Sequence, residues 1–249
     1  MPDIIHASAT AGPPAALQAL DEQGFVFIRA ADMRRLLPTD AVEGFDDFAR
    51  SWDRLGDDRF MADGGRYRRR RHATFAVGSG EIERRPHQPH YQSRDYNMLN
   101  GGIERWFDPV EPEVGAGAAL RGILSFADRV FSGLTPHGPP LWHVEVHQFR
   151  IETALDAAGL PTPEGLHRDG VDWVLVLLVA RHNVEEGVTK IHGADREECG
   201  SFCLATPFDT VLVDDRRIYH AVTPILPIEP GGPAYRDVLV VTFKNVRDG

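Results

Sequence analysis

The sequence predicts a mainly β fold, an antiparallel barrel or sandwich, with α-helices flanking it. From about Trp142 onward, short runs rich in β-branched and aromatic residues are separated by Gly, Pro, Asp and Asn. Before that point, apolar residues recur every three or four positions in two segments, as on one face of an amphipathic helix. The length of 249 residues is enough for one well-packed domain. We therefore expect a single domain over residues 1–249, with 1–140 forming a mostly helical buttress and loops and 141–249 most of the β core.

The helical part begins with AALQALDEQ, followed by Gly24 as a helix C-cap and by FVFI as an early strand. A helix is expected after Asp40, because the apolar residues there share one helical face: Val42, Phe45, Phe48, Trp52 and Leu55. The same spacing predicts a longer second helix, with the apolar face Leu120, Ile123, Leu124, Ala127, Val130, Phe131 and Leu134. PHGPP at 136–140 joins this part to the β-rich part.

The β-rich part opens with WHVEVHQFRI, an alternating strand. Its apolar face carries Trp142, Val144 and Val146, and its other face carries His143, Glu145 and His147. Six further β-rich runs follow, separated by turn residues: WVLVLLVA, VTKIHG, SFCLATP, DTVLVDD, RIYHAVTPI and RDVLVVTFKNV.

Composition narrows the class of partner. The formal net charge of −10 argues against a general nucleic-acid binder or a polybasic membrane-surface protein. The stretch MPDIIHASATAGPPAALQAL lacks the basic segment and apolar run of a signal peptide, and no stretch approaches the roughly 18 apolar residues of a membrane span. Cys199 and Cys203 are expected to be reduced thiols of a cytoplasmic protein. A small molecule is the expected partner, and the oligomeric state is not set by the sequence.

Two ionisable residues, His167 and Asp169, stand just before the seven apolar residues from 173 to 179. Ionisable groups at the start of a buried strand carry a free-energy cost of desolvation unless something binds them. At positions i and i+2 of a strand, both side chains point to the same face and reach one metal ion. A third ligand from a neighbouring strand is His220, in the run VLVDDRRIYHAVTPI.

Two imidazoles and one carboxylate on one side of a metal form the facial triad of non-haem Fe(II) oxygenases, which leaves positions open for a chelating co-substrate and dioxygen. Arg236 opens the last strong strand, sixteen residues after His220. A guanidinium fixed there would bind a carboxylate in bidentate fashion. The alternative is an ordinary His and Asp at a strand entry, solvated or capping a turn.

The stretch PEGLHRDGVDWVLVLLVARHN at 163–183, with DDRRIYHAVTPI and YRDVLVVTF, resembles the bacterial 2-oxoglutarate- and Fe(II)-dependent dioxygenase family that includes L-isoleucine hydroxylase. The likeness extends upstream through DGGRYRRRRHATF and HYQSRDYNMLNGGIERWF, so it covers most of the chain. His167, Asp169 and His220 match the family's iron ligands. Arg236 matches the arginine that anchors 2-oxoglutarate.

The resemblance implies a double-stranded β-helix, which is a jelly-roll and cupin-like fold. It implies hydroxylation of a free L-amino acid or similar small carboxylate, with Fe(II), 2-oxoglutarate and dioxygen, giving succinate and carbon dioxide. Many 2-oxoglutarate oxygenases place Ser or Thr two residues after the anchoring arginine, where this chain has Val238. A second donor to the co-substrate carboxylate is therefore expected from Thr223 or Tyr219.

Two other function classes stay open at this point. One is a cupin-like metalloenzyme that does not use 2-oxoglutarate, for which loss of the Arg236 guanidinium should barely matter. The other is a non-catalytic jelly-roll module that binds metal and releases no succinate. A rival zinc site is conceivable in His143, Glu145 and His147, which share one strand face. In the jelly-roll interpretation, His147 or Glu145 instead contacts substrate or co-substrate.

Two upstream segments supply candidate substrate residues. In RYRRRRH at 66–72, the strand period puts Arg68 and Arg70 on one face and Arg69 and Arg71 on the other, so at most one pair faces a pocket and the others are expected to pair with acidic residues. The loop HYQSRDYNMLNGG at 90–102 carries polar side chains that orient ligands, or else it is a plain surface loop. The candidate substrate residues are Arg70, His90, Gln92, Tyr96, Asn97 and His147.

Overall fold

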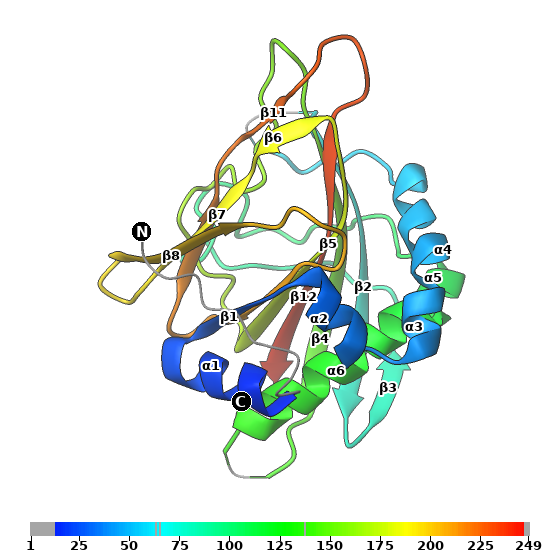
Figure 1. The fold of residues 1–249 in the computed structure, drawn as a ribbon, viewed down its shortest axis with the longest axis vertical. Coiled ribbons are helices and arrows are strands. Elements are labelled where there is room, and N and C mark those ends of the chain that lie inside the picture. The colour runs from blue at the N-terminus through cyan, green and yellow to red at the C-terminus, as the bar shows by residue number, and fades with distance from the viewer. Residues whose placement is uncertain (1–12, 63, 65, 137, 247–249) are drawn as a thin grey trace.

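A computed structural model of the chain describes residues 13–62, 64, 66–136 and 138–246. Its main element is a seven-stranded antiparallel sheet that runs through the middle of the molecule (Figure 1). The strands, in spatial order, are β1 (Phe25–Ile28), β9 (Thr210–Asp214), β5 (Trp173–His182), β12 (Tyr235–Asn245), β4 (Trp142–Glu152), β2 (Arg68–Gly78) and β3 (Glu81–Arg84).

Two smaller antiparallel sheets pack on the inner face of the large one. The first consists of β10 (Tyr219–Val222), β7 (Val188–His192) and β8 (Glu198–Cys203), and the second of β11 (Ile225–Pro227) and β6 (Val184–Glu186). Apolar residues from the large sheet and from β7 and β8 form one buried cluster, which joins the two walls. This arrangement, mainly β with flanking helices, confirms the expected double-stranded β-helix.

The continuous apolar run of β5 follows from its burial on both faces. Leu175 and Leu177 belong to the core between the large sheet and the helices. Val174 and Leu178 belong to the cluster between the large and small sheets. Because alternate residues point to opposite faces, a strand with two buried faces carries no polar alternation.

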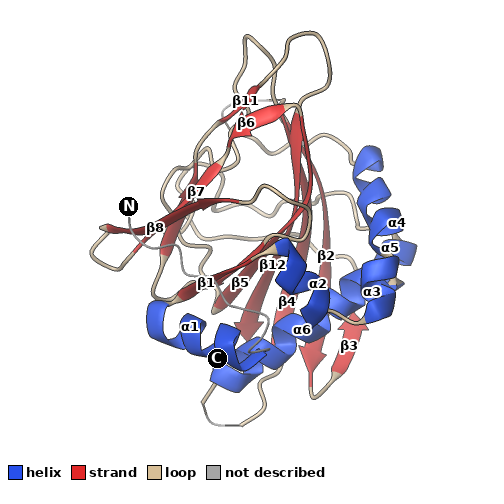
Figure 2. Ribbon diagram, in the orientation of Figure 1, coloured by secondary structure: helices blue, strands red, loops and turns tan. Residues whose placement is uncertain are grey.

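Helices cover the outer face of the large sheet (Figure 2). They are α1 (Pro13–Gln23), α2 (Ala30–Leu36), α3 (Thr39–Glu43), α4 (Phe45–Arg50), the 3-10 helix η2 (Ser51–Arg54), α5 (Pro112–Ala116) and α6 (Ala118–Leu134). The predicted long helix is α6, whose apolar face packs on the sheet, with the Phe131 ring stacked on Trp173 at 5.3 Å between centroids. Gly24 ends α1 as predicted, with φ +78° and its N–H donating to the Leu20 carbonyl at 2.9 Å.

One helix prediction needs correction. The segment after Asp40 is not one amphipathic helix but α3, α4 and η2 in succession. Gly44, at φ −80° and ψ 0°, separates α3 from α4. Phe45, Phe48 and Trp52 are nevertheless all buried against the sheet, because the breaks preserve the apolar face.

The predicted β-rich runs after residue 141 are β4 to β12, and residues before it add β1, β2 and β3 to the large sheet. Within the described residues, no helix is long and apolar enough to cross a membrane. Cys199 and Cys203 are free, as predicted. The first twelve residues, on which the expectation about a signal peptide depends, lie outside the described part.

Candidate metal centre and adjoining cavities

His167, Asp169 and His220 meet at one point. Each offers a ligand atom, and the three atoms lie within 4.8 Å of one another. The Nε2 atoms of His167 and His220 lie 3.8 and 3.7 Å from the two carboxylate oxygens of Asp169. The backbones of the two histidines are paired, with the His167 N–H donating to the His220 carbonyl at 3.1 Å and the reverse bond at 2.9 Å. The spacing therefore suits one shared ion.

The local backbone differs from the predicted one. His167 and Asp169 precede β5 rather than lie on it, and Gly170 has φ +84°. The Asp215 carboxylate accepts the backbone N–H groups of residues 169, 170 and 171 at 2.8, 2.7 and 3.1 Å. The β9–β10 turn thus fixes the ligand segment, so a turn rather than the strand period brings the two ligands together.

The histidine tautomers fit metal binding. Nδ1 of His167 donates to the Gly165 carbonyl at 2.9 Å, which leaves the Nε2 lone pair directed to the shared point. Burial lowers the pKa of His220 to about 3, so this imidazole is neutral at pH 7. Burial by itself would lower the pKa of His167, but the carboxylates of Asp169 and Glu164 raise it. A bound cation opposes that protonation, since a metal ligand must be deprotonated.

A cavity of about 130 Å³ lies inside the barrel beside these ligands. Arg236, at the start of β12, lines it together with His167, Asp169 and His220. The guanidinium is 2% exposed, its Nε has no partner, and it donates no side-chain hydrogen bond to the described residues. Burial lowers its pKa to about 10, so it remains charged at pH 7. A buried, unpaired cation is costly, and a dicarboxylate that reaches the metal would satisfy it.

The structure does not bring the expected second donors to this cavity. Neither Thr223 nor Tyr219 is among the residues that line it in the described part of the chain. The Thr223 hydroxyl instead accepts the Val188 N–H at 2.9 Å, and the Tyr219 ring packs under Arg168. Thr189 on β7 is buried and lines the cavity, and its hydroxyl is the better placed donor.

A larger cavity of about 470 Å³ adjoins the first. The two share walls at Asp169, Glu164 and Phe149, so the candidate metal ligand Asp169 faces both. All the residues that the sequence indicated for substrate line the larger cavity: Arg70, His90, Gln92, Tyr96, Asn97 and His147. Gln92 also donates to the Asp169 carbonyl at 3.1 Å, which ties the 90–102 loop to the metal ligands.

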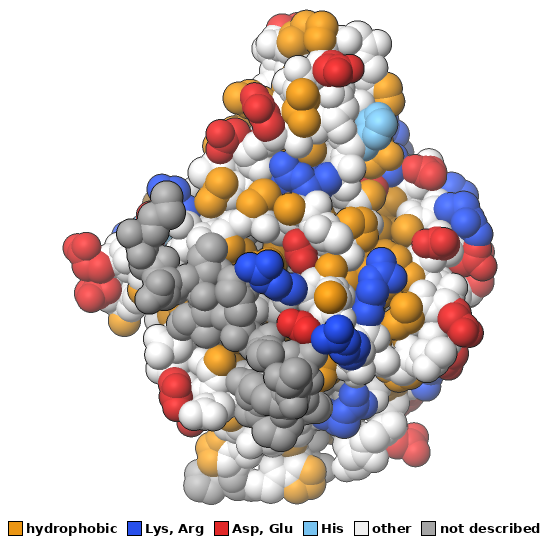
Figure 3. Space-filling model, in the orientation of Figure 1, with side chains coloured by type: hydrophobic (Ala, Val, Ile, Leu, Met, Phe, Trp, Pro, Cys, Tyr) orange, Lys and Arg blue, Asp and Glu red, His pale blue; other side chains and the backbone are white. Residues whose placement is uncertain are grey.

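The strand period sorts the arginine run as predicted. Arg68 and Arg70 are buried and line the larger cavity, and Arg68 is paired with Asp58 at 2.7 Å. Arg69 and Arg71 point the other way, to Glu152 at 2.8 Å and Glu111 at 3.0 Å. On the face in Figure 3, basic and acidic side chains of the described residues both occur, rather than one sign alone.

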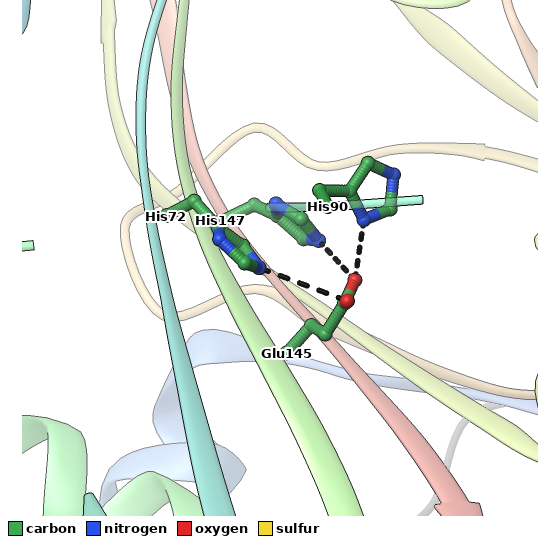
Figure 4. A group of neighbouring side chains, drawn as sticks. All are labelled: His72, His90, Glu145 and His147. Carbon is green, nitrogen blue, oxygen red and sulfur yellow. Dashed lines mark hydrogen bonds and ion pairs between the residues drawn. The ribbon is translucent and has the colours of Figure 1, made fainter. Parts of the chain in front are cut away.

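Figure 4 shows Glu145 of β4 facing His72, His90 and His147. The carboxylate oxygens lie 2.5 Å from Nδ1 of His90, 3.4 Å from Nε2 of His147 and 3.8 Å from Nε2 of His72. Burial lowers the pKa of His72 to about 3 and that of His147 well below its usual value. Burial would raise the pKa of Glu145, but the surrounding histidines hold it well below its usual range. An ionised carboxylate thus lies among neutral imidazoles.

This hydrogen-bond pattern opposes the rival zinc site. Nδ1 of His147 lies 2.7 Å from Nη2 of Arg70, which only donates, so Nδ1 must accept. The neutral ring then carries its proton on Nε2, which faces Glu145 and has no lone pair for a metal. His143 is not among the residues whose ligand atoms lie close together.

The sequence missed four residues of this region. Arg105 lines the larger cavity, Glu164 lines both cavities, Thr189 lines the smaller one, and Asp215 fixes the ligand segment. Asp215 stood in the quoted run DDRRIYH and Arg105 in GGIERWF, but neither has a local pattern that sets it apart from a solvated charge.

A double-stranded β-helix that holds two imidazoles, one carboxylate and an unpaired arginine around a small interior cavity defines a class, the non-haem iron oxygenases. The chain belongs to the 2OG-Fe dioxygenase family, whose model matches residues 49–242. The family's group is Fe(II) with 2-oxoglutarate and dioxygen, and the residues present fit it: the donor set suits Fe(II), and the orphaned Nε of Arg236 suits a carboxylate.

Individual relatives agree with the family. The chain is 28% identical to L-isoleucine-4-hydroxylase of Bacillus thuringiensis over 158 residues, which are 62% of this chain and 64% of that protein, slightly less than two thirds. It is 29% identical to 3(1)-hydroxy-L-isoleucine 4-dioxygenase of Pantoea ananatis over 169 residues, 67% of this chain and 68% of that one. A solved structure of a BsmA homologue from Methylobium petroleophilum is 36% identical, with TM-score 0.84 and 94% of each chain covered.

Proposed function

We propose that the protein is an Fe(II)- and 2-oxoglutarate-dependent dioxygenase that hydroxylates a free L-amino acid or similar small carboxylate. The observation that carries the proposal is the meeting of His167, Asp169 and His220 beside a cavity that holds the unpaired Arg236. The substrate class is supported by the two amino acid-hydroxylating relatives and by a second, polar cavity that shares a wall with the metal ligands.

The residues around the two cavities have separate proposed roles. His167, Asp169 and His220 hold the metal, and Asp215 keeps the Asp169 segment in place through three backbone N–H groups. Arg236 binds the far carboxylate of 2-oxoglutarate, with Thr189 as the proposed second donor. When bound, Fe(II) with 2-oxoglutarate activates dioxygen, and 2-oxoglutarate becomes succinate and carbon dioxide.

The walls of the small cavity exclude water from the co-substrate. They consist largely of valine side chains, contributed by β5, β9 and β12: Val174, Val176, Val211, Val213, Val238 and Val240. A dry, apolar pocket strengthens the Arg236–carboxylate attraction and keeps the oxidation directed to the bound substrate.

We propose one catalytic domain, with the segments before residue 141 supplying β2 and the 88–105 wall of the substrate cavity. A small molecule is the proposed partner. The free thiols of Cys199 and Cys203 support a reducing compartment, and the cytoplasm is the proposed location.

The test is reconstitution with Fe(II) and 2-oxoglutarate under anaerobic conditions, followed by air exposure with each of the free L-amino acids. Succinate formation and a product heavier by one oxygen atom are expected with at least one of them. His167→Ala should abolish succinate formation, whereas His182→Ala, an exposed histidine on β5, should leave it intact. Undiminished succinate release by His167→Ala would overturn the metal assignment. Iron binding without succinate release from any amino acid would favour the non-catalytic module instead.

A further inference from the structure

Arg105 is a second buried arginine without a partner. It lies on the wall of the larger cavity and is 2% exposed. Its Nε and Nη2 are buried and have no hydrogen-bond partner among the described residues. Its one contact of note is the Phe107 ring, 5.7 Å from the guanidinium carbon. The side chain is therefore a buried cation without an ion-pair partner, although the carboxylates of Asp58, Glu164 and Glu145 are near enough to act on its pKa.

The other arginines of the cavity are not in this state. Arg68 is bound to Asp58 at 2.7 Å, and Arg70 donates to His147 at 2.7 Å. Burial lowers the pKa of Arg105, with the positive charge of Arg68 adding to the effect, yet a guanidinium stays protonated in proteins. Leaving such a group unpaired in the interior is costly, and the same reasoning applied to Arg236 points to a ligand carboxylate.

Glu145 supplies the opposite charge in the same cavity. One of its oxygens is bound by His90 at 2.5 Å and contacted by His147 at 3.4 Å. The other oxygen lies 3.8 Å from Nε2 of both His72 and His143, beyond hydrogen-bond distance. That oxygen is free to accept hydrogen bonds from a ligand.

His90 is bonded to both residues. Its backbone pairs with that of Arg105 through bonds of 3.0 and 2.9 Å, and its ring binds Glu145. Arg105 and Glu145 both line the larger cavity, so a ligand that enters it meets an unpaired cation and a carboxylate with an oxygen that can accept hydrogen bonds.

We propose that Arg105 binds the α-carboxylate and Glu145 the α-ammonium of the substrate, so that the two residues select a zwitterionic amino acid. This inference rests on the proposed function and adds its recognition residues. A metal ion is the poorer occupant, because Nε2 of His147 carries a proton and three arginines, Arg68, Arg70 and Arg105, line the same cavity.

The test measures equilibrium binding, not turnover. Protein loaded anaerobically with Fe(II) and 2-oxoglutarate is titrated by calorimetry with an amino acid that supports succinate formation, with its carboxamide, and with its deaminated acid. Wild-type protein should prefer the amino acid over each analogue by about 10- to 100-fold, the range for charge-assisted hydrogen bonds.

Each variant should erase one preference and keep the other. Arg105→Met should bind the amino acid and its carboxamide equally, and still discriminate against the deaminated acid. Glu145→Gln should bind the amino acid and its deaminated acid equally, and still discriminate against the carboxamide. Arg105→Lys should retain most of the carboxylate preference. Because Nε and Nη2 of Arg105 are buried without a hydrogen-bond partner, Arg105→Met should also unfold at the wild-type temperature or above without ligand, which a structural arginine would not allow.

Matched controls are Arg94→Met and Glu104→Gln, exposed residues of the same segment that do not line the cavity, and both should bind like wild type. If the Arg105 and Glu145 variants keep both preferences while wild type turns over an amino acid, the recognition assignment is wrong and the proposed function stands. If wild type binds Fe(II) and 2-oxoglutarate but neither binds nor oxidises any amino acid, the proposed function itself fails.

Discussion

Replacement of Arg236 by Gln tests whether the small cavity binds a dicarboxylate. The guanidinium lies among valine side chains and donates no hydrogen bond to the described residues, so a bound carboxylate would be its principal partner. A bidentate arginine contributes two charge-assisted bonds of about 1.5–3 kcal/mol each. Gln keeps one neutral donor and leaves the carboxylate without a counter-charge, so we expect a loss of about 3 kcal/mol.

That loss corresponds to a roughly 100-fold rise in the Kd for 2-oxoglutarate. Calorimetric titration of the Fe(II)-loaded protein in the absence of dioxygen measures it directly. The affinity of Arg236→Gln for Fe(II) should stay within about threefold of the wild-type value, because Arg236 is not among the proposed metal ligands. The Kd of Arg236→Lys for 2-oxoglutarate should lie between those of the wild type and Arg236→Gln, because lysine keeps the charge but not the bidentate geometry. In the absence of 2-oxoglutarate, the free energy of unfolding should change by less than about 1 kcal/mol, since no protein partner is lost. An unchanged Kd in Arg236→Gln would refute the reasoning and favour a metalloenzyme that does not use 2-oxoglutarate.

Three further predictions concern the supports of the site. Asp215→Ala should weaken Fe(II) binding by about 10- to 100-fold in a metal titration while circular dichroism stays native, because three backbone N–H groups of the ligand segment lose their acceptor; unaltered affinity would contradict this role. Gly170→Ala should lower both the Tm and the rate of succinate formation, because Gly170 has φ +84° and an added Cβ would lie 2.5 Å from the Tyr96 ring; a wild-type Tm would show that the loop adapts freely. His72, whose pKa burial lowers to about 3, binds its proton more weakly in the folded state than in the unfolded state, where the pKa is about 6.5. Its contribution to stability is therefore full above pH 6.5 and is lost as the pH falls, by about 1.4 kcal/mol between pH 7.5 and 5.5. In urea unfolding, His72→Phe should reduce the pH dependence by about that amount, and an identical pH profile would contradict the assignment.

The convergence of the three candidate metal ligands was predictable because each carries a local signal. His167 and Asp169 stand before an unbroken apolar run, and His220 follows a polar turn between apolar stretches. The alternation in β4 and β2 likewise placed Glu145, His147 and Arg70 on faces that do look into the cavity. The reason is that strand period and burial are set by neighbours one or two residues away.

Arg105, Asp215 and Thr189 carry no such signal. Each acts through partners distant in sequence: Asp215 holds a backbone segment 46 residues away, and Thr189 reaches the cavity only because β7 folds across the large sheet. Thr223 and Tyr219 were reasonable candidates from their place near His220, but it is His220 and Val222, the alternate residues of this segment, that line the cavity. Gly44 similarly interrupts a helix that the apolar period would continue.

By itself, the sequence determined the β-rich class and indicated the three candidate metal ligands, the proposed anchoring arginine and the polar loop that lines the larger cavity, because short-range patterns of polarity encode each of them. Only the tertiary structure decided which charges are left without partners. In sequence, a solvated, a paired and an unpaired arginine look alike. Arg105 and Arg236 differ from the rest because the folded chain buries them and leaves nitrogen atoms of each guanidinium group without a partner.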